Sequence, residues 1–182
     1  MPDDVTLEAF VAQIADRTPA PGGGGVAATA CAMAAALVEM AARFGTDPAA
    51  GAEAQEAAQL RGRALELIDA DAAAFGPVLA AARAGEDPEP ARQAAAEPPL
   101  EMARIGARLA ELAAGRAADG NPNLRGDAVT GALLAEAGTR SAVELVAINL
   151  TDPADPRRVQ AAQAASSAAR ARSRALGAAG EE

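Results

Sequence analysis

Apolar residues recur along this chain with the period of an α-helix. Near the N-terminus, Leu7, Phe10, Val11 and Ile14 are spaced as i, i+3, i+4 and i+7. This spacing predicts a short amphipathic helix that ends before Thr18. Long stretches rich in Ala, Leu, Glu, Arg and Gln follow, without the sustained alternation that is typical of strands. The pattern predicts an all-α fold.

Breaks in the helical pattern divide the rest of the chain into five further helices. The breaks hold proline or glycine, which interrupt helices. The predicted helices run from about Gly25 to Phe44, from about Gly51 to Arg83, from about Glu89 to Ala118 with an interruption at Pro98-Pro99, from about Asp127 to Ile148, and from Pro153 or Pro156 to about Ala178. Because no linker is long enough to separate two domains, we expect residues 1–182 to form one domain, an up-and-down bundle of about six helices.

One face of the helix expected at residues 51–83 carries a carboxylate among apolar residues. Leu67, Asp71 and Phe75 follow one another at spacings of four, so Asp71 lies on the face predicted to be buried. Asp69 lies about 200° away around the helix, so the two aspartates do not form one paired site. A buried carboxylate needs a cation, a ligand or a proton. Asp71 is therefore a candidate functional residue, although a salt bridge to an arginine or a place at a subunit boundary would explain it equally well.

A proline- and glycine-rich run directly precedes the helix expected at Gly25–Phe44. Pro19-Ala20-Pro21 is followed by the four glycines Gly22-Gly23-Gly24-Gly25, which predict a tightly turning, bare backbone at a helix N-terminus. Such a place suits an anion or a flat polar ligand. A loop where two helices approach closely would give the same composition.

Five polar residues at the ends of predicted helices are further candidates. They are Glu101 in the first turn after a proline pair, Asn121 and Asn123 in a polar turn, Asp127 at the start of the next helix, and Asn149 at the end of an apolar run. Stabilisation of a helix start, capping, or satisfaction of backbone groups explains each one without any function.

Composition and charge narrow the classes of function. With 51% hydrophobic and 23% charged residues, the 182-residue chain is expected to be globular. The formal net charge of −9, with arginines interleaved among acids, argues against a nucleic-acid partner. The apolar share is mostly alanine, and the aromatic residues are Phe10, Phe44 and Phe75. This predicts a thin core of close-packed helices, a kind of core that often gains stability in an oligomer.

The sequence favours a cytoplasmic protein with no membrane partner. The start, Met1-Pro2-Asp3-Asp4, lacks the basic and apolar blocks of a signal peptide. The stretch from Val26 to Phe44 is mostly alanine, contains Glu39, and falls short of the roughly 20 strongly apolar residues that a bilayer requires. The single cysteine, Cys31, excludes an internal disulfide and is interpreted as core filler.

Taken in order, these motifs resemble the formiminotetrahydrofolate cyclodeaminase / methenyltetrahydrofolate cyclohydrolase family. The motifs that carry the resemblance are Pro19-Ala20-Pro21-Gly22-Gly23-Gly24-Gly25-Val26-Ala27-Ala28, Asp69-Ala70-Asp71-Ala72-Ala73-Ala74-Phe75, Pro99-Leu100-Glu101, Gly120-Asn121-Pro122-Asn123 with Asp127, and Ile148-Asn149-Leu150. They span about residues 7–150.

The resemblance implies an all-helical homodimer with a folate site near the subunit boundary. A cyclodeaminase of this family converts 5-formimino-tetrahydrofolate to 5,10-methenyl-tetrahydrofolate and ammonia, and a cyclohydrolase interconverts methenyl- and 10-formyl-tetrahydrofolate. By motif match, Asp71 is the first candidate for the catalytic carboxylate, followed by Asp69 and Asp127. The matching substrate-binding positions are Pro21, Gly22, Gly23, Gly24, Gly25, Glu101, Asn121, Asn123 and Asn149.

The residue types suit this chemistry. With no histidine in the chain, carboxylates are the natural acid–base groups, and no metal cofactor is expected. The sequence departs from the family pattern at Thr46-Asp47, where a basic pair is usual, and at Gly25 and Gly126, where serine is common. The alternative hypothesis is a catalytically silent helical dimer that binds folate or has a structural role.

Overall fold

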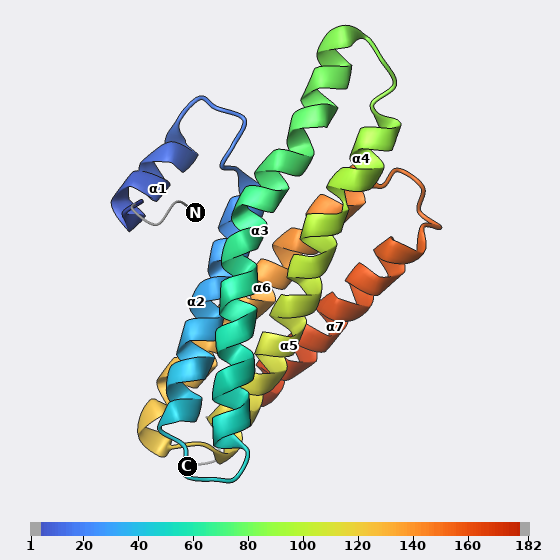
Figure 1. Cartoon of the computed structure of the whole chain (residues 1–182). Helices are drawn as coiled ribbons and strands as arrows, with labels where there is room; N and C mark the ends of the chain where they lie inside the picture. The colour runs from blue at the N-terminus through green and yellow to red at the C-terminus, as the bar shows by residue number, and fades with distance from the viewer. Residues whose placement is uncertain (1–4, 179–182) are drawn as a thin grey trace.

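The computed structural model describes residues 5–178, which form helices joined by loops, with no β-strand in that range (Figure 1). The elements are α1 (Leu7–Ala15), α2 (Gly23–Arg43), α3 (Ala50–Ala84), α4 (Glu89–Ala95), α5 (Glu97–Asp119), the 3₁₀ turn η1 (Pro122–Leu124), α6 (Arg125–Asn149) and α7 (Pro156–Gly177). Successive long helices run up and down the bundle, and α1 stands beside one end of α2 and α3. The predicted all-α fold is confirmed.

The helix that follows the glycine run begins two residues earlier than predicted. Gly23, Gly24 and Gly25 form the first turn of α2, with Gly22 as its N-cap. An added Cβ at Gly24 would overlap the carboxylate of Asp71. An added Cβ at Gly25 would lie 3.3 Å from the Cβ of Pro21. Gly24 and Gly25 are therefore needed for close packing of the start of α2 against its neighbours, more than for an unusual turn.

The predicted fourth helix is divided at Ala96, not at the proline pair. Proline is compatible with the first turn of a helix, where an amide hydrogen has no intrahelical acceptor. Pro98 and Pro99 accordingly lie in the first turn of α5, which begins at Glu97. Glu101 was expected in that first turn, and this was wrong, because the earlier start of α5 places it one turn further along.

Small residues let α2 and α6 approach closely. An added Cβ at Gly131 would lie 3.5 Å from the carbonyl oxygen of Ala34, and one at Gly138 only 2.8 Å from the sulfur of Cys31. Cys31 is fully buried, and burial raises the pKa of its thiol to about 12. The prediction that Cys31 fills the core is confirmed.

Helix α2 is long and apolar enough, by length and composition alone, to cross a membrane. In the bundle, 61% of its most apolar 18-residue window is buried inside the protein. Most side chains of that window therefore face α3, α5 and α6, as in the central helix of a bundle.

Candidate active site

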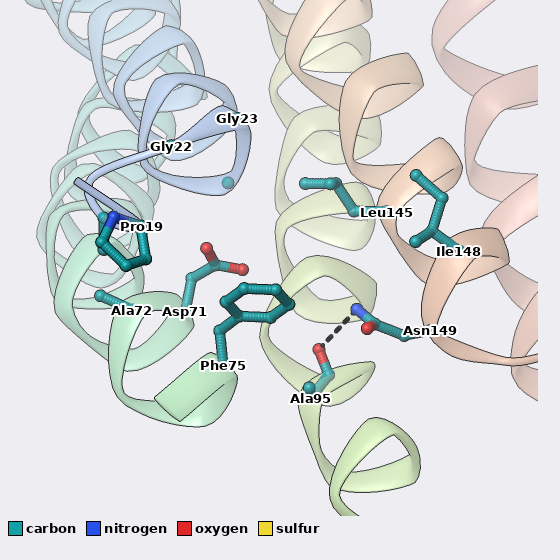
Figure 2. A pocket seen from close by; sticks show the side chains of 12 residues that line it. Pro19, Gly22, Gly23, Asp71, Ala72, Phe75, Ala95, Leu145, Ile148 and Asn149 are labelled. Atoms are coloured by element: carbon teal, nitrogen blue, oxygen red, sulfur yellow. Dashed lines mark hydrogen bonds between the residues drawn. The ribbon is translucent and has the colours of Figure 1, made fainter. Parts of the chain in front are cut away.

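A pocket lies at the end of the bundle where α2 begins (Figure 2). Its volume is about 150 Å³. The loop before α2 and the first turn of α2 form one wall, α3 a second, and the ends of α4 and α6 the rest. The lining residues are Pro19, Ala20, Gly22, Gly23, Gly24, Asp71, Ala72, Phe75, Ala95, Leu145, Ile148 and Asn149.

Asp71 is the acidic residue that lines this pocket. Its half-buried carboxylate lies against Gly24, between the glycine turn and the ring of Phe75 (Figure 2). Burial raises the pKa of the Asp71 carboxyl above its ordinary value of 3.8, and no hydrogen bond or charge opposes that shift. The salt bridge to an arginine that the sequence left open is not formed among residues 5–178. Within the described part of the chain, Asp71 is thus a carboxylate that faces a cavity and has no hydrogen-bond or ion-pair partner.

The rest of the pocket combines apolar surface with backbone amides. Phe75 is 38% exposed and Ile148 is 66% exposed, so both leave apolar surface available at the rim. Phe75 was expected to be buried with its neighbours, and this was wrong because its ring lies at the mouth of the pocket. The first amide groups of any helix have no intrahelical acceptor, and here the glycines leave them unobstructed by side chains.

Asn149 is the second polar side chain in the pocket. It is the last residue of α6, and its Nδ2 donates a hydrogen bond to the carbonyl oxygen of Ala95 at 3.1 Å. The sequence left open whether this amide binds a ligand or satisfies backbone groups. It does satisfy a backbone group, of a different helix, while also lining the pocket.

Asp69 lies outside the pocket, as its position around the helix predicts. It is exposed and lines a neighbouring crevice under α1, where Pro21 and Phe10 are also found. Gly25 is buried between the two hollows, against Pro21 and Ile68. Of the predicted residues near the glycine run, Gly22, Gly23 and Gly24 therefore face the pocket together with Asp71, whereas Asp69, Pro21 and Gly25 do not.

Glu101 is held in an ion pair on the outside of the bundle. Its two carboxylate oxygens accept from Nε and Nη2 of Arg63 at 2.6 and 2.8 Å. This guanidinium lowers the pKa of Glu101. Glu101 therefore ties α5 to α3 and does not line the pocket.

Asn121, Asn123 and Asp127 lie at the opposite end of the bundle. The side chain of Asn121 accepts a hydrogen bond from the amide of Asn123 at 3.0 Å, and Asp127 is in the first turn of α6. Since α6 ends at Asn149, its length at about 1.5 Å per residue separates Asp127 from the pocket by roughly 33 Å. Within one chain these three residues cannot join Asp71.

The described part of the chain contains no cluster of side chains that could bind a metal ion. Among residues 5–178, no group of three or more His, Cys, Asp or Glu side chains lies close enough to hold an ion. The chemistry available to the pocket from the described chain is therefore that of one carboxyl, one amide, backbone amides and an apolar rim.

Comparison with known proteins shows the family to which this chain belongs. The sequence profile of the formiminotransferase-cyclodeaminase family matches residues 6–168. The chain belongs to this family. It is 34% identical over 169 residues to the methenyltetrahydrofolate cyclohydrolase of Methylorubrum extorquens, covering 82% of this chain and 81% of that protein. The family that the sequence motifs predict is confirmed.

A solved structure of the family extends the comparison to the fold. The crystal structure of formiminotetrahydrofolate cyclodeaminase from Thermotoga maritima superposes with a TM-score of 0.89, at 26% sequence identity, over 96% of each chain. The family fold therefore covers nearly the whole of this protein.

Sequence reasoning gave no site role to three residues on the α4 and α6 side of the pocket, Leu145, Ile148 and Ala95. Ile148 was part of a motif beside Asn149, whereas Leu145 and Ala95 were not singled out. Ile148 carried a usable signal, because it is a large apolar residue directly beside the polar Asn149. Nothing in the sequence distinguishes Ala95 from the many other alanines around it, so its place in the pocket could not be predicted.

Proposed function

We propose that this protein is a folate-dependent one-carbon enzyme that acts on the bridging carbon between N5 and N10 of tetrahydrofolate. The observation that carries the proposal is the partly buried Asp71 carboxyl, which has no partner among residues 5–178 and lies beside the bare first turn of α2. The 34% identical relative supports methenyltetrahydrofolate cyclohydrolase activity. The structural match over 96% of both chains supports formiminotetrahydrofolate cyclodeaminase activity as the second candidate.

In the cyclohydrolase reaction, water attacks the cationic methenyl carbon and loses a proton. The remaining hydroxyl proton then leaves as the bond from that carbon to N5 breaks and N5 gains a proton, and 10-formyl-tetrahydrofolate results with the release of one proton overall. The Asp71 carboxylate is suited to take the proton from water and to stabilise the cation before attack. A pKa raised by burial brings the carboxyl closer to neutral pH, where it can both accept and return a proton.

In the cyclodeaminase reaction, N10 attacks the formimino carbon and ammonia leaves after proton transfer. A bond from N10 to carbon forms and the bond from carbon to the formimino nitrogen breaks, giving the same methenyl cation. A single carboxyl that moves a proton from N10 to the leaving nitrogen serves this reaction as well. The two reactions thus require the same residue in the same place.

The pocket of a single chain accommodates part of such a substrate. Ligand pockets commonly measure about 300–1,000 Å³, whereas this one measures about 150 Å³. Its apolar rim, Phe75 and Ile148, suits the flat face of a ring, and the amide of Asn149 suits a ring edge that bears hydrogen-bonding groups. The remainder of the substrate would lie beyond the rim.

We further propose that the protein is a homodimer that completes the site. Val26 and Met33 on α2 and Phe44 directly after it are 43%, 46% and 63% exposed. With the partly buried Leu37 and Met40, they form an apolar stripe at spacings of three, four and seven along the outside of α2.

The predicted site residues lie near the two opposite ends of this stripe. Gly23 begins α2 at the pocket, and Phe44 at its other end lines a hollow with Asn121. A two-fold contact between antiparallel copies of α2 would place the Asn121 end of one chain beside the Asp71 end of its partner. The stripe therefore fits a second copy of this chain, and Asp127 would reach the site from there.

A direct assay tests the proposed function. Purified protein is given methenyl-tetrahydrofolate in one sample and 5-formimino-tetrahydrofolate in another, and methenyl absorbance is followed against blanks without protein. Faster decay in the first sample supports the cyclohydrolase, and faster appearance with release of ammonia in the second supports the cyclodeaminase. The variant Asp71→Asn should lower kcat by about 10²- to 10⁴-fold while its circular dichroism spectrum stays that of the wild type.

Absence of turnover in both samples would contradict the enzyme proposal. A thermal shift on addition of the folate, in the absence of turnover, would then support the catalytically silent folate-binding dimer.

A further inference from the structure

The Ala95 carbonyl oxygen in the pocket wall has no amide partner within its own helix. The hydrogen bonds on both sides of the junction at Ala96 are of the α-type, from the Ala96 amide to the Arg92 carbonyl and from the Leu100 amide to the Ala96 carbonyl. In the same register the Ala95 carbonyl would accept from residue 99 of α5, but Pro99 has no amide hydrogen. Pro98, which would serve a tighter 3₁₀ turn, lacks one too. The next amide, of Leu100, donates to the carbonyl of Ala96 at 3.1 Å. Three successive possible donors are thus removed from one oxygen.

The side chain of Asn149 donates the hydrogen bond that this carbonyl oxygen lacks within the helix. Its Nδ2 lies 3.1 Å from the Ala95 carbonyl, across the gap between the ends of α6 and α4 (Figure 2). Ala95 is only 4% exposed, and Pro99 is fully buried. A buried carbonyl without a donor is costly, so the geometry favours this one orientation of the Asn149 amide.

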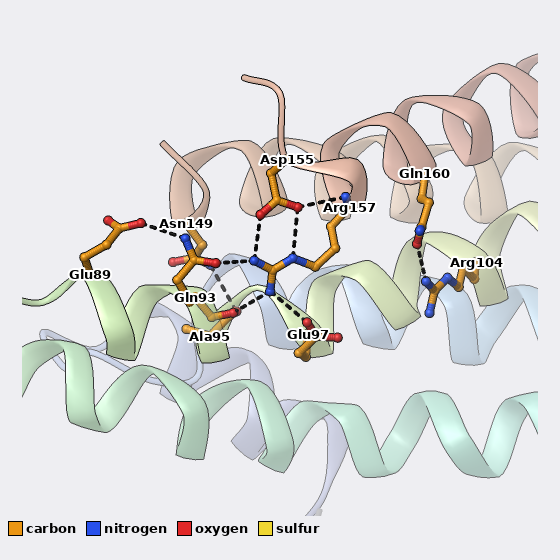
Figure 3. Close-up of polar contacts among 9 residues, drawn as sticks. All are labelled: Glu89, Gln93, Ala95, Glu97, Arg104, Asn149, Asp155, Arg157 and Gln160. Carbon is orange, nitrogen blue, oxygen red and sulfur yellow. Dashed lines mark hydrogen bonds and ion pairs between the residues drawn. The ribbon is translucent and has the colours of Figure 1, made fainter. Parts of the chain in front are cut away.

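The end of α4 that presents this carbonyl is itself fixed. Arg157, at the start of α7, donates from Nη1 to the Gln93 carbonyl oxygen at 3.0 Å and to Glu97 Oε1 at 2.9 Å (Figure 3). Asp155 accepts from the same guanidinium at 2.7 Å. These contacts hold the end of α4 against α7. The Ala95 carbonyl oxygen therefore has a fixed position from which it can orient the Asn149 amide.

The bond leaves part of the Asn149 amide for a ligand. A primary amide has two N–H donors and one carbonyl acceptor, and Ala95 uses one donor. The second donor and Oδ1 remain available on a side chain that lines the pocket. Together they suit a ligand that offers both a hydrogen-bond acceptor and a donor, as a cyclic amide does.

We propose that Pro99 is a positioning residue of the site. Because Pro99 has no amide hydrogen, the Ala95 carbonyl stays available to accept from Asn149. This hydrogen bond fixes the orientation of the side-chain amide that contacts the ligand. The effect of Pro99 on substrate binding rests on the proposed function, whereas its effect on the orientation of Asn149 does not.

The test compares Pro99→Ala with Pro98→Ala. Alanine at position 99 restores the hydrogen that competes for the Ala95 carbonyl, and Pro99→Ser restores the same hydrogen if the alanine variant folds poorly. The backbone here has α-type hydrogen bonds, from the Leu100 amide to the Ala96 carbonyl and from the Ala96 amide to the Arg92 carbonyl, each at 3.1 Å. In this geometry alanine at position 98 restores a hydrogen directed at the carbonyl of Ala94, not at that of Ala95. Pro98→Ala is thus the matched control, with the same chemical change one residue away.

The first measurement is made without ligand on the full chain. The Nδ2 amide signal of Asn149 is recorded by NMR and assigned by its absence in Asn149→Ala. We expect Pro99→Ala to move this signal towards that of an exposed amide and Pro98→Ala to leave it in place. An unmoved signal in Pro99→Ala, or equal movement in both variants, would overturn the proposal.

The second measurement is kinetic. Pro99→Ala should raise KM by about three- to tenfold, the effect of one weakened hydrogen bond, with kcat nearly unchanged, and Pro98→Ala should not. In the Asn149→Ala background, Pro99→Ala should add nothing, because the two act through the same amide. Additive effects would show a merely structural role and overturn the proposal. If the wild type turns over neither folate, the proposed function fails while the NMR comparison still decides the role of Pro99.

Discussion

The Asp71 carboxylate occupies the place where a side chain at Gly24 would stand. The first turn of α2 and the middle of α3 therefore meet with no atom between the glycine Cα and the acid. This contact sets the position of the acid relative to the bare amides at the start of α2. It gives one glycine of the run a specific role that its neighbours do not share.

Gly24→Ala should displace the Asp71 carboxylate and lower activity. A misplacement of about 1 Å can cost on the order of a hundredfold in rate, so we expect kcat/KM to fall by about that factor in the methenyl absorbance assay. Gly62→Ala is the matched control, because Gly62 is an exposed position in α3 with nothing within 4 Å of an added Cβ. Equal activity in both variants would show that the Gly24 contact does not position the acid.

Asp71→Asn should become more stable than the wild type as the pH rises. Because burial raises the folded-state pKa above the ordinary 3.8, folding favours the protonated carboxyl. Its stabilising contribution is present below pH 3.8 and is lost as the pH rises through the folded-state pKa. Asparagine does not ionise, so urea unfolding from pH 3.5 to about pH 7 should show a difference that grows with pH. A difference that is constant over this range would contradict the shifted pKa.

Met33→Asp should separate the proposed dimer into monomers. The substitution places a charge in the middle of the apolar stripe on α2, where contact with a second copy would remove it from water. Sedimentation velocity should give twice the chain mass of 18.0 kDa for the wild type and the single chain mass for the variant. Val159→Asp is the control, because Val159 is 52% exposed on α7, away from the stripe. A monomeric wild type would contradict the dimer.

Mixing Asp71→Asn with Asp127→Asn should restore activity that neither variant has alone. If each site takes Asp71 from one chain and Asp127 from its partner, a mixed dimer contains one intact site of two. Since half of the dimers are mixed after subunit exchange, about a quarter of wild-type activity is expected. Continued inactivity after verified exchange would show that the two aspartates do not meet across an interface, and an active Asp127→Asn variant would remove Asp127 from the catalytic set.

Hydrophobic periodicity predicted the helices well because each long helix carries an apolar face and ends at a Pro or Gly break. The boundaries at the glycine run and at Ala96 were missed for opposite reasons. At the glycine run, the Asp71 carboxylate packs against Gly24 in the first turn of α2, which is a tertiary contact that local sequence does not specify. At Ala96, Pro98 and Pro99 are helical because a first turn tolerates proline.

The candidate site was only partly predictable. Asp71 stood out because a carboxylate on an apolar helix face is rare, and Asn149 because it ends an apolar run. Glu101 matched a family motif, but its ion pair with Arg63 depends on the packing of α5 on α3, which local sequence does not specify. Asp127 is similarly placed at the far end of the bundle by the length of α6, a relationship that only the three-dimensional structure gives.

Because α2 and α6 approach closely at Cys31 and Gly138, this core should tolerate smaller side chains better than larger ones. Most buried residues here are alanines, which offer few atoms to delete and have no rotamers to lose on folding. Truncation therefore has little to remove, whereas adding one methyl group at Gly138 drives it into the sulfur of Cys31. Natural variation in this core should consequently be limited by an upper bound on side-chain volume, and lineages should exchange glycine, alanine and serine there far more freely than they gain leucine or phenylalanine.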